Sequence, residues 1–312
     1  MNNAFRILIL STIIISVAGW SIKTVVDSRN DCLRGKIVFA RSTGKDAGIY
    51  FGDLSTGQQR RLSDSPSLDE FPKWSPAGTS IVFVSYRAGN AQIYKMNADG
   101  SQVVRLTRDP YYDLHPVWSP DGKYIAFDQN LNNKAQLFLM DSDGNNIKRL
   151  TTDDFNDSTP AWAPNGNEIV FGSDRESHNI VGETPLYTIN LSTGIQIPLG
   201  KDAYGYAPEW SPDGTLISYF SDTKSIRSSI DRILLYSIKN RESSLLIAGD
   251  IGPNNEPGYS YYDPVWSSDG KCILFLQDRK GENVDVINLA TRKLTLVPHF
   301  DEIASVDWTA IR

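Results

Sequence analysis

A short phrase built around tryptophan recurs along most of this chain and constrains its fold more than any other feature. Residues 71–76 read Phe-Pro-Lys-Trp-Ser-Pro, and four later segments repeat the proline two residues before a tryptophan and the tight turn after it. The repeat tryptophans are Trp74, Trp118, Trp162, Trp210 and Trp266, and a sixth, Trp308, stands near the end. A unit of this length cannot bury its own apolar face, so we expect stacked units with function on their loops.

The copy around Trp118 shows what one unit contains. An extended segment ends at Trp118, and Ser119-Pro120-Asp121-Gly122 has Pro and Gly where a type I turn prefers them. Residues 123–127, 136–140 and 147–151 then read as three further strands. The tryptophan spacings of 44, 44, 48, 56 and 42 residues suit a four-stranded antiparallel propeller blade.

The two ends of the chain predict how the array closes. Residues 36–39 read as a second strand without a first, and the strand that ends at Trp308 has no second strand after it. The C-terminal strand therefore completes the N-terminal blade, and closure protects edges that would otherwise aggregate. We predict an all-β fold, a six-bladed β-propeller of four-stranded antiparallel blades closed in this way.

The motif Pro-x-Trp-Ser-Pro-Asp-Gly, followed by an Ile-x-Phe strand, resembles the repeats of the TolB-type β-propeller, a WD-repeat-like periplasmic family. The resemblance covers residues 36–312, with departures at Ala77, Asn165 and Ser268 in the turns. It is a resemblance to the propeller only, because the α/β domain that precedes the TolB propeller does not fit before residue 36. The resemblance implies a periplasmic protein partner.

The N-terminus differs in composition from the rest of the chain. Arg6 precedes an apolar run, and Ser16-Val17-Ala18 offers the small residues of a cleavage site. We expect residues 1–22 to be a signal peptide or an uncleaved N-terminal anchor, residues 23–35 a linker, and residues 36–312 the propeller. The protein is then exported, periplasmic or extracellular, and reaches a membrane only through an uncleaved anchor.

The charge balance argues against one class of partner. The formal net charge is −6, and no basic stripe interleaved with aromatic residues occurs, which disfavours nucleic acid. We expect a monomer.

Two cysteines, Cys32 and Cys272, permit a disulfide in an exported protein. Both are predicted on the same face of neighbouring blades, where a bridge would tie the N-terminal lead to the last blade. The alternative is two free thiols.

Propeller topology predicts one face of short turns and one face of long, variable connections, such as residues 174–185, 222–231 and 247–263. Variable loops on a rigid scaffold usually carry binding. At the channel mouth on that face we predict an acidic arc and a tyrosine arc that bind a partner or a cation. The candidate residues are Asp69, Asp113 and Asp157, and Tyr204, Tyr206, Tyr259, Tyr261 and Tyr262, with His115 on the same face. The alternative is that each aspartate caps its own loop.

Catalytic signatures are weak. His115, His178 and His299 come from separate units and do not predict a metal site, although a structural cation in the channel is an alternative. No Gly-x-Ser-x-Gly elbow occurs. We therefore expect no cofactor, and a non-enzymatic module that binds a protein or peptide in the cell envelope. The alternative is a lyase or hydrolase that acts on a glycan or peptide at the channel mouth.

Overall fold

The computed structural model describes residues 32–41, 46–175, 184–200, 202–225, 228–249, 260–278 and 282–309. The predicted leader, residues 1–22, and most of the predicted linker lie outside these ranges. Within the described residues, no helix has the length and hydropathy needed to cross a membrane.

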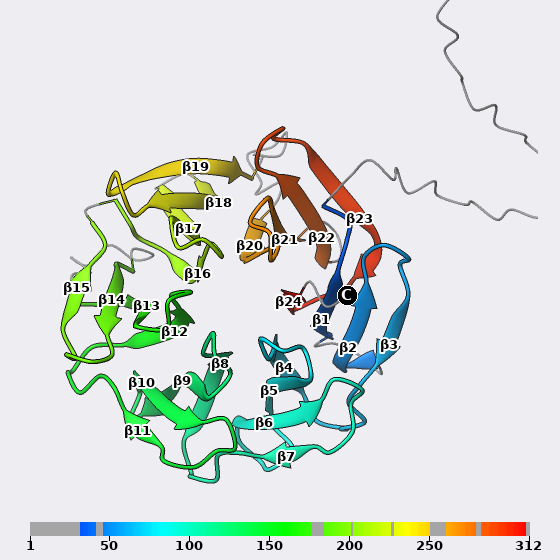
Figure 1. Cartoon of the computed structure of the whole chain (residues 1–312), viewed down its shortest axis with the longest axis vertical. Coiled ribbons are helices and arrows are strands. Elements are labelled where there is room, and N and C mark those ends of the chain that lie inside the picture. Colours follow the sequence, from blue (N-terminus) through cyan, green and yellow to red (C-terminus); the bar gives the residue numbers. More distant parts are fainter. Residues whose placement is uncertain are drawn as a thin grey trace, which may run out of the picture. The chain divides into compact units, whose positions relative to one another are not determined.

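Six four-stranded antiparallel sheets form a ring in the described residues (Figure 1). The strands, from the channel outward, are β24 (Ser305–Thr309), β1 (Lys36–Arg41), β2 (Gly48–Asp53) and β3 (Gln59–Arg61) in blade 1; β4 (Asp69–Trp74), β5 (Ser80–Ser85), β6 (Gln92–Asn97) and β7 (Val104–Arg105) in blade 2; β8 (Tyr112–Trp118), β9 (Tyr124–Leu131), β10 (Lys134–Asp141) and β11 (Lys148–Arg149) in blade 3; β12 (Asp157–Trp162), β13 (Glu168–Ser173), β14 (Leu186–Asn190) and β15 (Gln196–Pro198) in blade 4; β16 (Tyr206–Trp210), β17 (Leu216–Ser225), β18 (Ser228–Ser237) and β19 (Glu242–Ala248) in blade 5; and β20 (Ser260–Trp266), β21 (Cys272–Asp278), β22 (Glu282–Asn288) and β23 (Leu294–Asp301) in blade 6.

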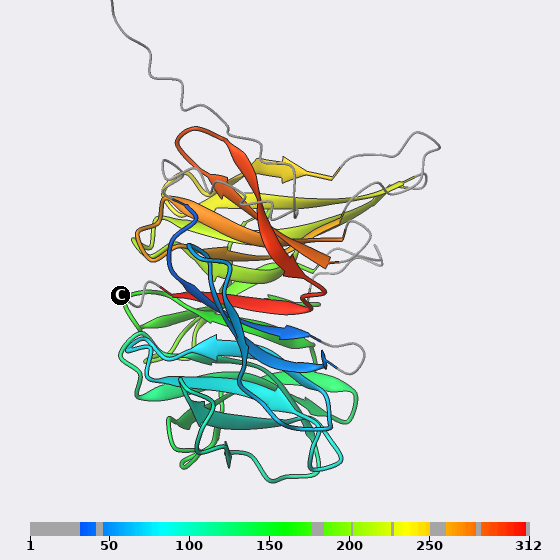
Figure 2. The same cartoon turned by 90° about the vertical axis from the view of Figure 1, so that its right-hand side faces the viewer.

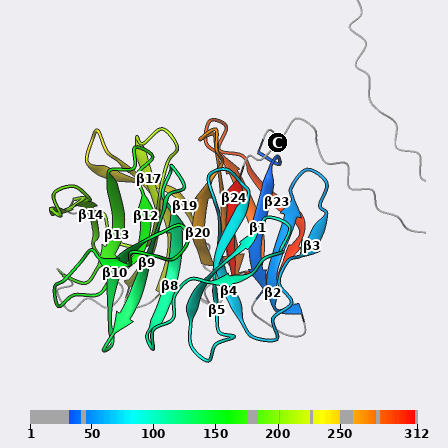
Figure 3. The same cartoon turned by 60° about the horizontal axis from the view of Figure 1, so that its bottom comes forward.

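The ring closes through strands from opposite ends of the chain. β24 pairs antiparallel with β1, with Trp308 opposite Ile37 and Val306 opposite Phe39. Figure 3 shows the red β24 beside the blue β1. The predicted six-bladed propeller and its closure are confirmed.

Hydrophobic packing lies between blades as well as within them. Each of six clusters of buried residues joins two neighbouring blades, including blades 6 and 1. The second strand of each blade contributes one fully buried aromatic ring: Phe39, Phe83, Phe127, Phe171, Tyr219 and Phe275. Burial of one such side chain contributes about 1.5–3 kcal/mol, so the blade contacts are a major source of stability.

The repeat tryptophans link adjacent blades. Trp118 Nε1 donates a hydrogen bond to the Lys73 carbonyl of blade 2 at 3.2 Å, and Trp162 Nε1 donates to the Val117 carbonyl of blade 3 at 3.3 Å. Five of the six rings are buried, and Trp210 is partly exposed. The tryptophans therefore pack one sheet onto the next, as a repeated position predicts.

The connection predicted over residues 222–231 is not a loop. β17 and β18 stay paired from Leu216↔Ser237 to Ser225↔Ser228, so this segment extends a two-stranded ribbon. Figure 2 shows the yellow-green ribbon reaching beyond the neighbouring blades. The segment is mostly polar and has no apolar alternation, so no pattern in the sequence indicated that the strands continue.

A disulfide joins Cys32 to Cys272, with the two Cα atoms 5.8 Å apart and both side chains buried. Asn288 Nδ2 lies 3.4 Å from Cys32 Sγ, and Trp308 Nε1 donates to the Arg34 carbonyl at 3.0 Å. The segment before β1 is therefore fixed to blade 6 beside the strand closure.

Candidate binding site in the central channel

A β-bulge occurs in the innermost strand of blades 2 to 6. In blade 2, Glu70 pairs with Val84 and Lys73 with Val82, so β4 has one residue more than β5 over this stretch. The same irregularity recurs in the other four blades. The residue before the repeat proline has positive φ in each bulge: Phe71 (51°), His115 (48°), Thr159 (53°), Ala207 (47°) and Asp263 (50°).

These five backbone conformations are strained. A left-handed conformation costs a non-glycine residue about 1–2 kcal/mol, and it is least favourable for a bulky or β-branched side chain such as Phe71 or Thr159. Strain of this kind persists only where the surrounding structure holds it, and it clusters at functional sites. The inner wall of the channel is therefore the first place to look for a function.

The extra residue changes which side chains face the channel. In β4, Glu70, Phe71 and Lys73 are partly exposed, whereas Asp69, Pro72 and Trp74 are buried. Counted back from each tryptophan, the residues one, three and four places before it thus project inward. Because these positions differ from blade to blade, the channel wall is chemically varied although the scaffold repeats.

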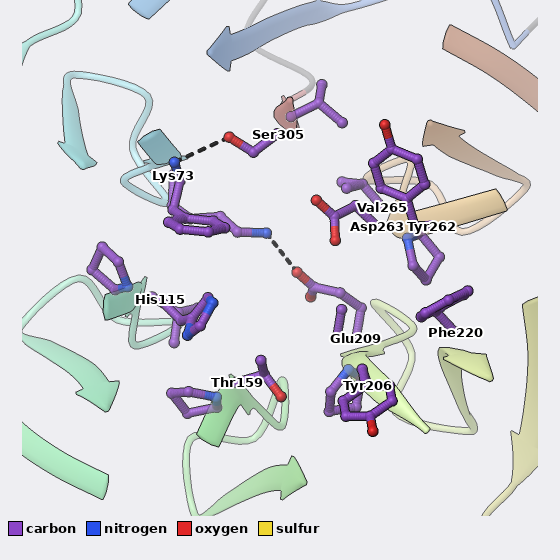
Figure 4. Close-up of a pocket in the computed structure, with 18 of the residues that line it drawn as sticks. Lys73, His115, Thr159, Tyr206, Glu209, Phe220, Tyr262, Asp263, Val265 and Ser305 are labelled. Atoms are coloured by element: carbon purple, nitrogen blue, oxygen red, sulfur yellow. Dashed lines mark hydrogen bonds and ion pairs between the residues drawn. The ribbon is translucent and has the colours of Figure 1, made fainter. Parts of the chain in front are cut away.

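The wall encloses a cavity of about 260 Å³ (Figure 4). Its side chains fall into an apolar group and a charged group. The aromatic members are Phe71, Tyr206, Phe220 and Tyr262, and the charged or titratable members are Lys73, His115, Glu209 and Asp263. Phe71 packs edge-on against His115, with ring centroids 4.6 Å apart, and Tyr206 lies 6.3 Å from Phe220.

Lys73 crosses the channel from blade 2 to blade 5. Its Nζ lies 2.7 Å from Glu209 Oε1 and 3.6 Å from Asp307 Oδ1 of blade 1 (Figure 4). Burial alone would lower the pKa of Lys73, but the two carboxylates outweigh it and raise the pKa. Burial raises the pKa of Asp307 to about 6, although Lys73 opposes this change. The ion pair ties opposite sides of the ring together.

His115 is held by a carboxylate behind it. His115 Nδ1 lies 2.7 Å from Asp128 Oδ1, and the same oxygen accepts a hydrogen bond from the Thr159 amide at 3.1 Å. Burial would lower the pKa of His115, but Asp128 more than offsets this and raises it. The pair fixes the imidazole in the wall of the cavity.

Asp263 projects into the cavity from the bulge of β20 (Figure 4). Burial raises the pKa of its carboxyl, and Lys73 and His115 partly counteract this increase. It is the fourth ionisable group of the wall.

The three aspartates of the predicted acidic arc are fully buried in their own blades. Asp69 pairs with Arg87 at 3.1 Å, Asp157 pairs with Arg175 at 2.9 Å, and Asp113 accepts a hydrogen bond from Gln129 at 2.7 Å. Burial raises the pKa of Asp113 to about 7 and that of Asp157 to about 6. None of the three lines the cavity, and their contribution to binding stays a prediction.

Of the predicted tyrosines, Tyr206 and Tyr262 line the cavity together with His115. Tyr204 forms a backbone bridge with Pro185 outside the cavity wall. Tyr259 lies outside the described residues, and only the backbone of Tyr261 is described. The structure thus brings three of the predicted residues together and separates them from the aspartates.

The other histidines do not join His115. His299 lies in the outer strand β23 of blade 6, where its carbonyl accepts a hydrogen bond from Gln59, so it is far from His115 in the inner strand of blade 3. His178 lies outside the described residues. Among the described residues, no group of three or more His, Cys, Asp or Glu side chains is arranged to hold a metal ion.

The sequence prediction missed Lys73, Glu209 and Asp263. Each stands one or three places before a repeat tryptophan, where several other copies carry apolar residues such as Val117 and Ala207. An ionisable residue where other copies are apolar was the available signal.

The fold and the cavity define a closed propeller with a candidate binding site in its channel. The family model described as the TolB beta propeller domain matches residues 34–181 and, in an overlapping match, residues 109–260. These matches together cover more than half of the chain, which therefore belongs to the TolB β-propeller family. A comparison with curated proteins found no match.

Solved structures with the same fold have varied roles. TolB from Acinetobacter baumannii is 19% identical with a TM-score of 0.72, over 88% of this chain and 66% of that chain. A nidogen/laminin complex contains a similar chain, 10% identical with a TM-score of 0.64, over 88% of this chain and 97% of that chain. Oligogalacturonate lyase from Vibrio parahaemolyticus is 14% identical with a TM-score of 0.54, over 85% of this chain and 74% of that chain. At these identities the likeness shows the fold alone, and this chain spans less than two thirds of the Acinetobacter TolB.

Proposed function

We propose that this protein is an exported, non-enzymatic binding module that receives part of a protein or peptide partner at the mouth of its channel. The observation that carries the proposal is the strained inner wall, which directs different side chains into one cavity of a repetitive scaffold. Aromatic residues such as Tyr206, Phe220 and Tyr262 supply the large, stiff contact area that is typical of binding hot spots.

Two further observations support a partner in the cell envelope. The apolar N-terminal segment after Arg6 favours export, and the buried disulfide suits an oxidising compartment. A similar propeller chain also occurs in a nidogen/laminin complex, so the fold is compatible with a protein partner.

An affinity pull-down from intact cell envelope, with the full-length protein as bait, tests the proposal. We expect a partner that binds the wild type, is lost with the Tyr206→Ala/Tyr262→Ala variant, and is retained by Tyr124→Ala. Tyr124 is a matched control because it is an exposed tyrosine beside the turn at residues 119–122, outside the cavity wall. Equal capture by all three proteins would count against a channel site.

The alternative is an enzyme with its site in the channel. The His115–Asp128 pair favours it, because a histidine oriented by a carboxylate is a common general base or acid. The oligogalacturonate lyase with a similar fold adds a glycan lyase to the candidates. A metal analysis of the purified protein and a screen of polyuronide and peptide substrates test it, and turnover that His115→Asn abolishes would favour the enzyme over the binding module.

A further inference from the structure

Asp263 differs from the other charged residues of the cavity wall. Lys73 and Glu209 pair with each other at 2.7 Å, and His115 pairs with Asp128 at 2.7 Å. Within the described part of the chain, no hydrogen bond or ion pair holds the Asp263 carboxylate, which points into the cavity (Figure 4). Asp263 is partly exposed to the cavity, and Lys73 and His115 act on its charge without forming an ion pair with it. A cation in the cavity would supply that ion pair.

The backbone conformation that places Asp263 in the cavity wall is strained. Its φ of 50° is left-handed, and the bulge lies between Tyr262 and Val265 of β20. Aspartate tolerates this conformation better than most residues, but an extended strand would still be more stable. This conformation thus places at the cavity a carboxylate that has no close ion pair but lies within the electrostatic reach of Lys73 and His115.

The walls beside Asp263 suit an organic cation. Tyr262, Tyr206 and Phe220 line the same cavity, and the negatively charged face of an aromatic ring attracts an ammonium or guanidinium group. An aromatic wall with a carboxylate discriminates in this way between a cationic side chain and a neutral one of the same shape.

The chain itself already places one ammonium group in this cavity. Lys73 Nζ lies between Glu209 at 2.7 Å and Asp307 at 3.6 Å. These contacts come from three different blades, so an amino group in the centre of the ring can reach carboxylates on several sides. The carboxylates of the wall thus already accommodate one internal ammonium, and its charge also acts on Asp263.

We propose that Asp263 and the aromatic wall beside it bind the cationic group of a ligand, a guanidinium or an ammonium, next to the Lys73–Glu209 ion pair. In the peptide partner on which the proposed function rests, that group is an arginine or lysine side chain. The cavity of about 260 Å³ matches a single side chain rather than a folded segment.

Calorimetric titration of the full-length protein tests the cation site directly. The probes are Nα-acetyl-arginine amide, Nα-acetyl-lysine amide and the neutral isostere Nα-acetyl-citrulline amide. We expect an arginine or lysine probe to bind about tenfold more tightly than citrulline, which corresponds to roughly 1.4 kcal/mol and to a partly desolvated cation–π and charge contact.

Asp263→Asn should remove this preference, while Asp269→Asn should preserve it. Asparagine tolerates a φ of 50°, and the substitution breaks no hydrogen bond of the described residues, so the variant should fold. Asp269 is a matched control because it lies in the exposed turn after Trp266, outside the cavity wall. Equal binding of all three probes to the wild type, or a preference that survives Asp263→Asn, would overturn the cation site.

A random-peptide selection against the wild type separates this inference from the proposed function. Peptides that bind the channel but are indifferent to Asp263→Asn would leave the partner site intact and refute the cation site. Binding of the cationic probes without any peptide or envelope partner would retain the cation site and refute the proposed function.

Discussion

At the scale of single residues, buried aspartates should make the stability of this propeller depend on pH. Burial raises the pKa of Asp113 to about 7, compared with roughly 3.9 for an unfolded chain. The native state therefore holds this proton more tightly, and the contribution of Asp113 to stability falls as the pH rises from about 4 to about 7. Asp113→Asn should raise the free energy of unfolding by about 1–2 kcal/mol at pH 8 and leave it unchanged near pH 4. Urea denaturation across this range measures the difference.

The pKa of Asp121 is shifted in the opposite direction to that of Asp113, so the two residues should affect stability in different pH ranges. Hydrogen bonds from Ser119 and Lys123 lower the pKa of this exposed turn residue to about 2. Its stabilising effect is present above about pH 4 and is lost as the pH falls toward 2, so Asp121→Asn should weaken the protein at neutral pH. If the free energy of unfolding changed with pH in the same way for Asp113→Asn and the wild type, burial would not control the titration of Asp113.

The Lys73 ion pair can be tested at the same scale. Lys73→Met would leave Glu209 and Asp307 without their cation in a partly buried site. Loss of one partner of a buried ion pair destabilises a protein strongly, and we expect the free energy of unfolding to fall by about 2–4 kcal/mol. The matched variant Lys123→Met removes an exposed pair with Asp121 and should leave the free energy of unfolding nearly unchanged. Similar denaturation midpoints for the two variants would contradict a structural role for the channel pair.

At the scale of the strand, the bulge before each repeat proline should carry measurable strain. Ala207 has a φ of 47°, whereas Ala161, in the corresponding strand of blade 4, lies outside the left-handed region and is buried. Ala207→Gly should stabilise the protein by about 0.5–1 kcal/mol, because glycine adopts positive φ without a penalty. Ala161→Gly should destabilise it by about 1 kcal/mol. Thermal unfolding of the two variants compares them, and destabilisation by both would indicate that the bulge is not strained.

The bulge also explains which part of the site the sequence could predict. The period of the tryptophan motif and its turns is a local pattern, and it was sufficient to predict six blades, their strands and the closure between the two ends. In a regular strand, the residues one, three and five places before the tryptophan share a face. The extra residue moves Asp69 to the buried side and brings Glu70 beside Phe71 on the channel side. The contact of Lys73 with Glu209 across the channel joins two blades far apart in the sequence, which a local pattern does not reveal.

At the scale of the whole molecule, ring closure depends on two links that lie side by side. β24 pairs with β1 through hydrogen bonds, and the disulfide from Cys32 to Cys272 joins the segment before β1 to blade 6. A propeller that opens at this seam loses the buried cluster between blades 6 and 1, which contains both cysteines, Phe300 and Trp308. The two links therefore stabilise the contact that joins the two ends of the described propeller.

The disulfide should stabilise the closed ring mainly by restricting the unfolded chain. It spans 240 residues, and a covalent loop of this size removes much of the conformational freedom of the denatured state. Cys32→Ser/Cys272→Ser should lower the free energy of unfolding by about 2–5 kcal/mol yet preserve the strand content, because β24 still pairs with β1. Guanidinium denaturation with and without reductant measures the effect: reductant should destabilise the wild type and leave the double variant unchanged. Mass spectrometry of the non-reduced wild type checks that the disulfide forms, and two free thiols in the oxidised protein would contradict it. Equal denaturation midpoints for the wild type and the double variant would show that the strand pairing alone closes the ring.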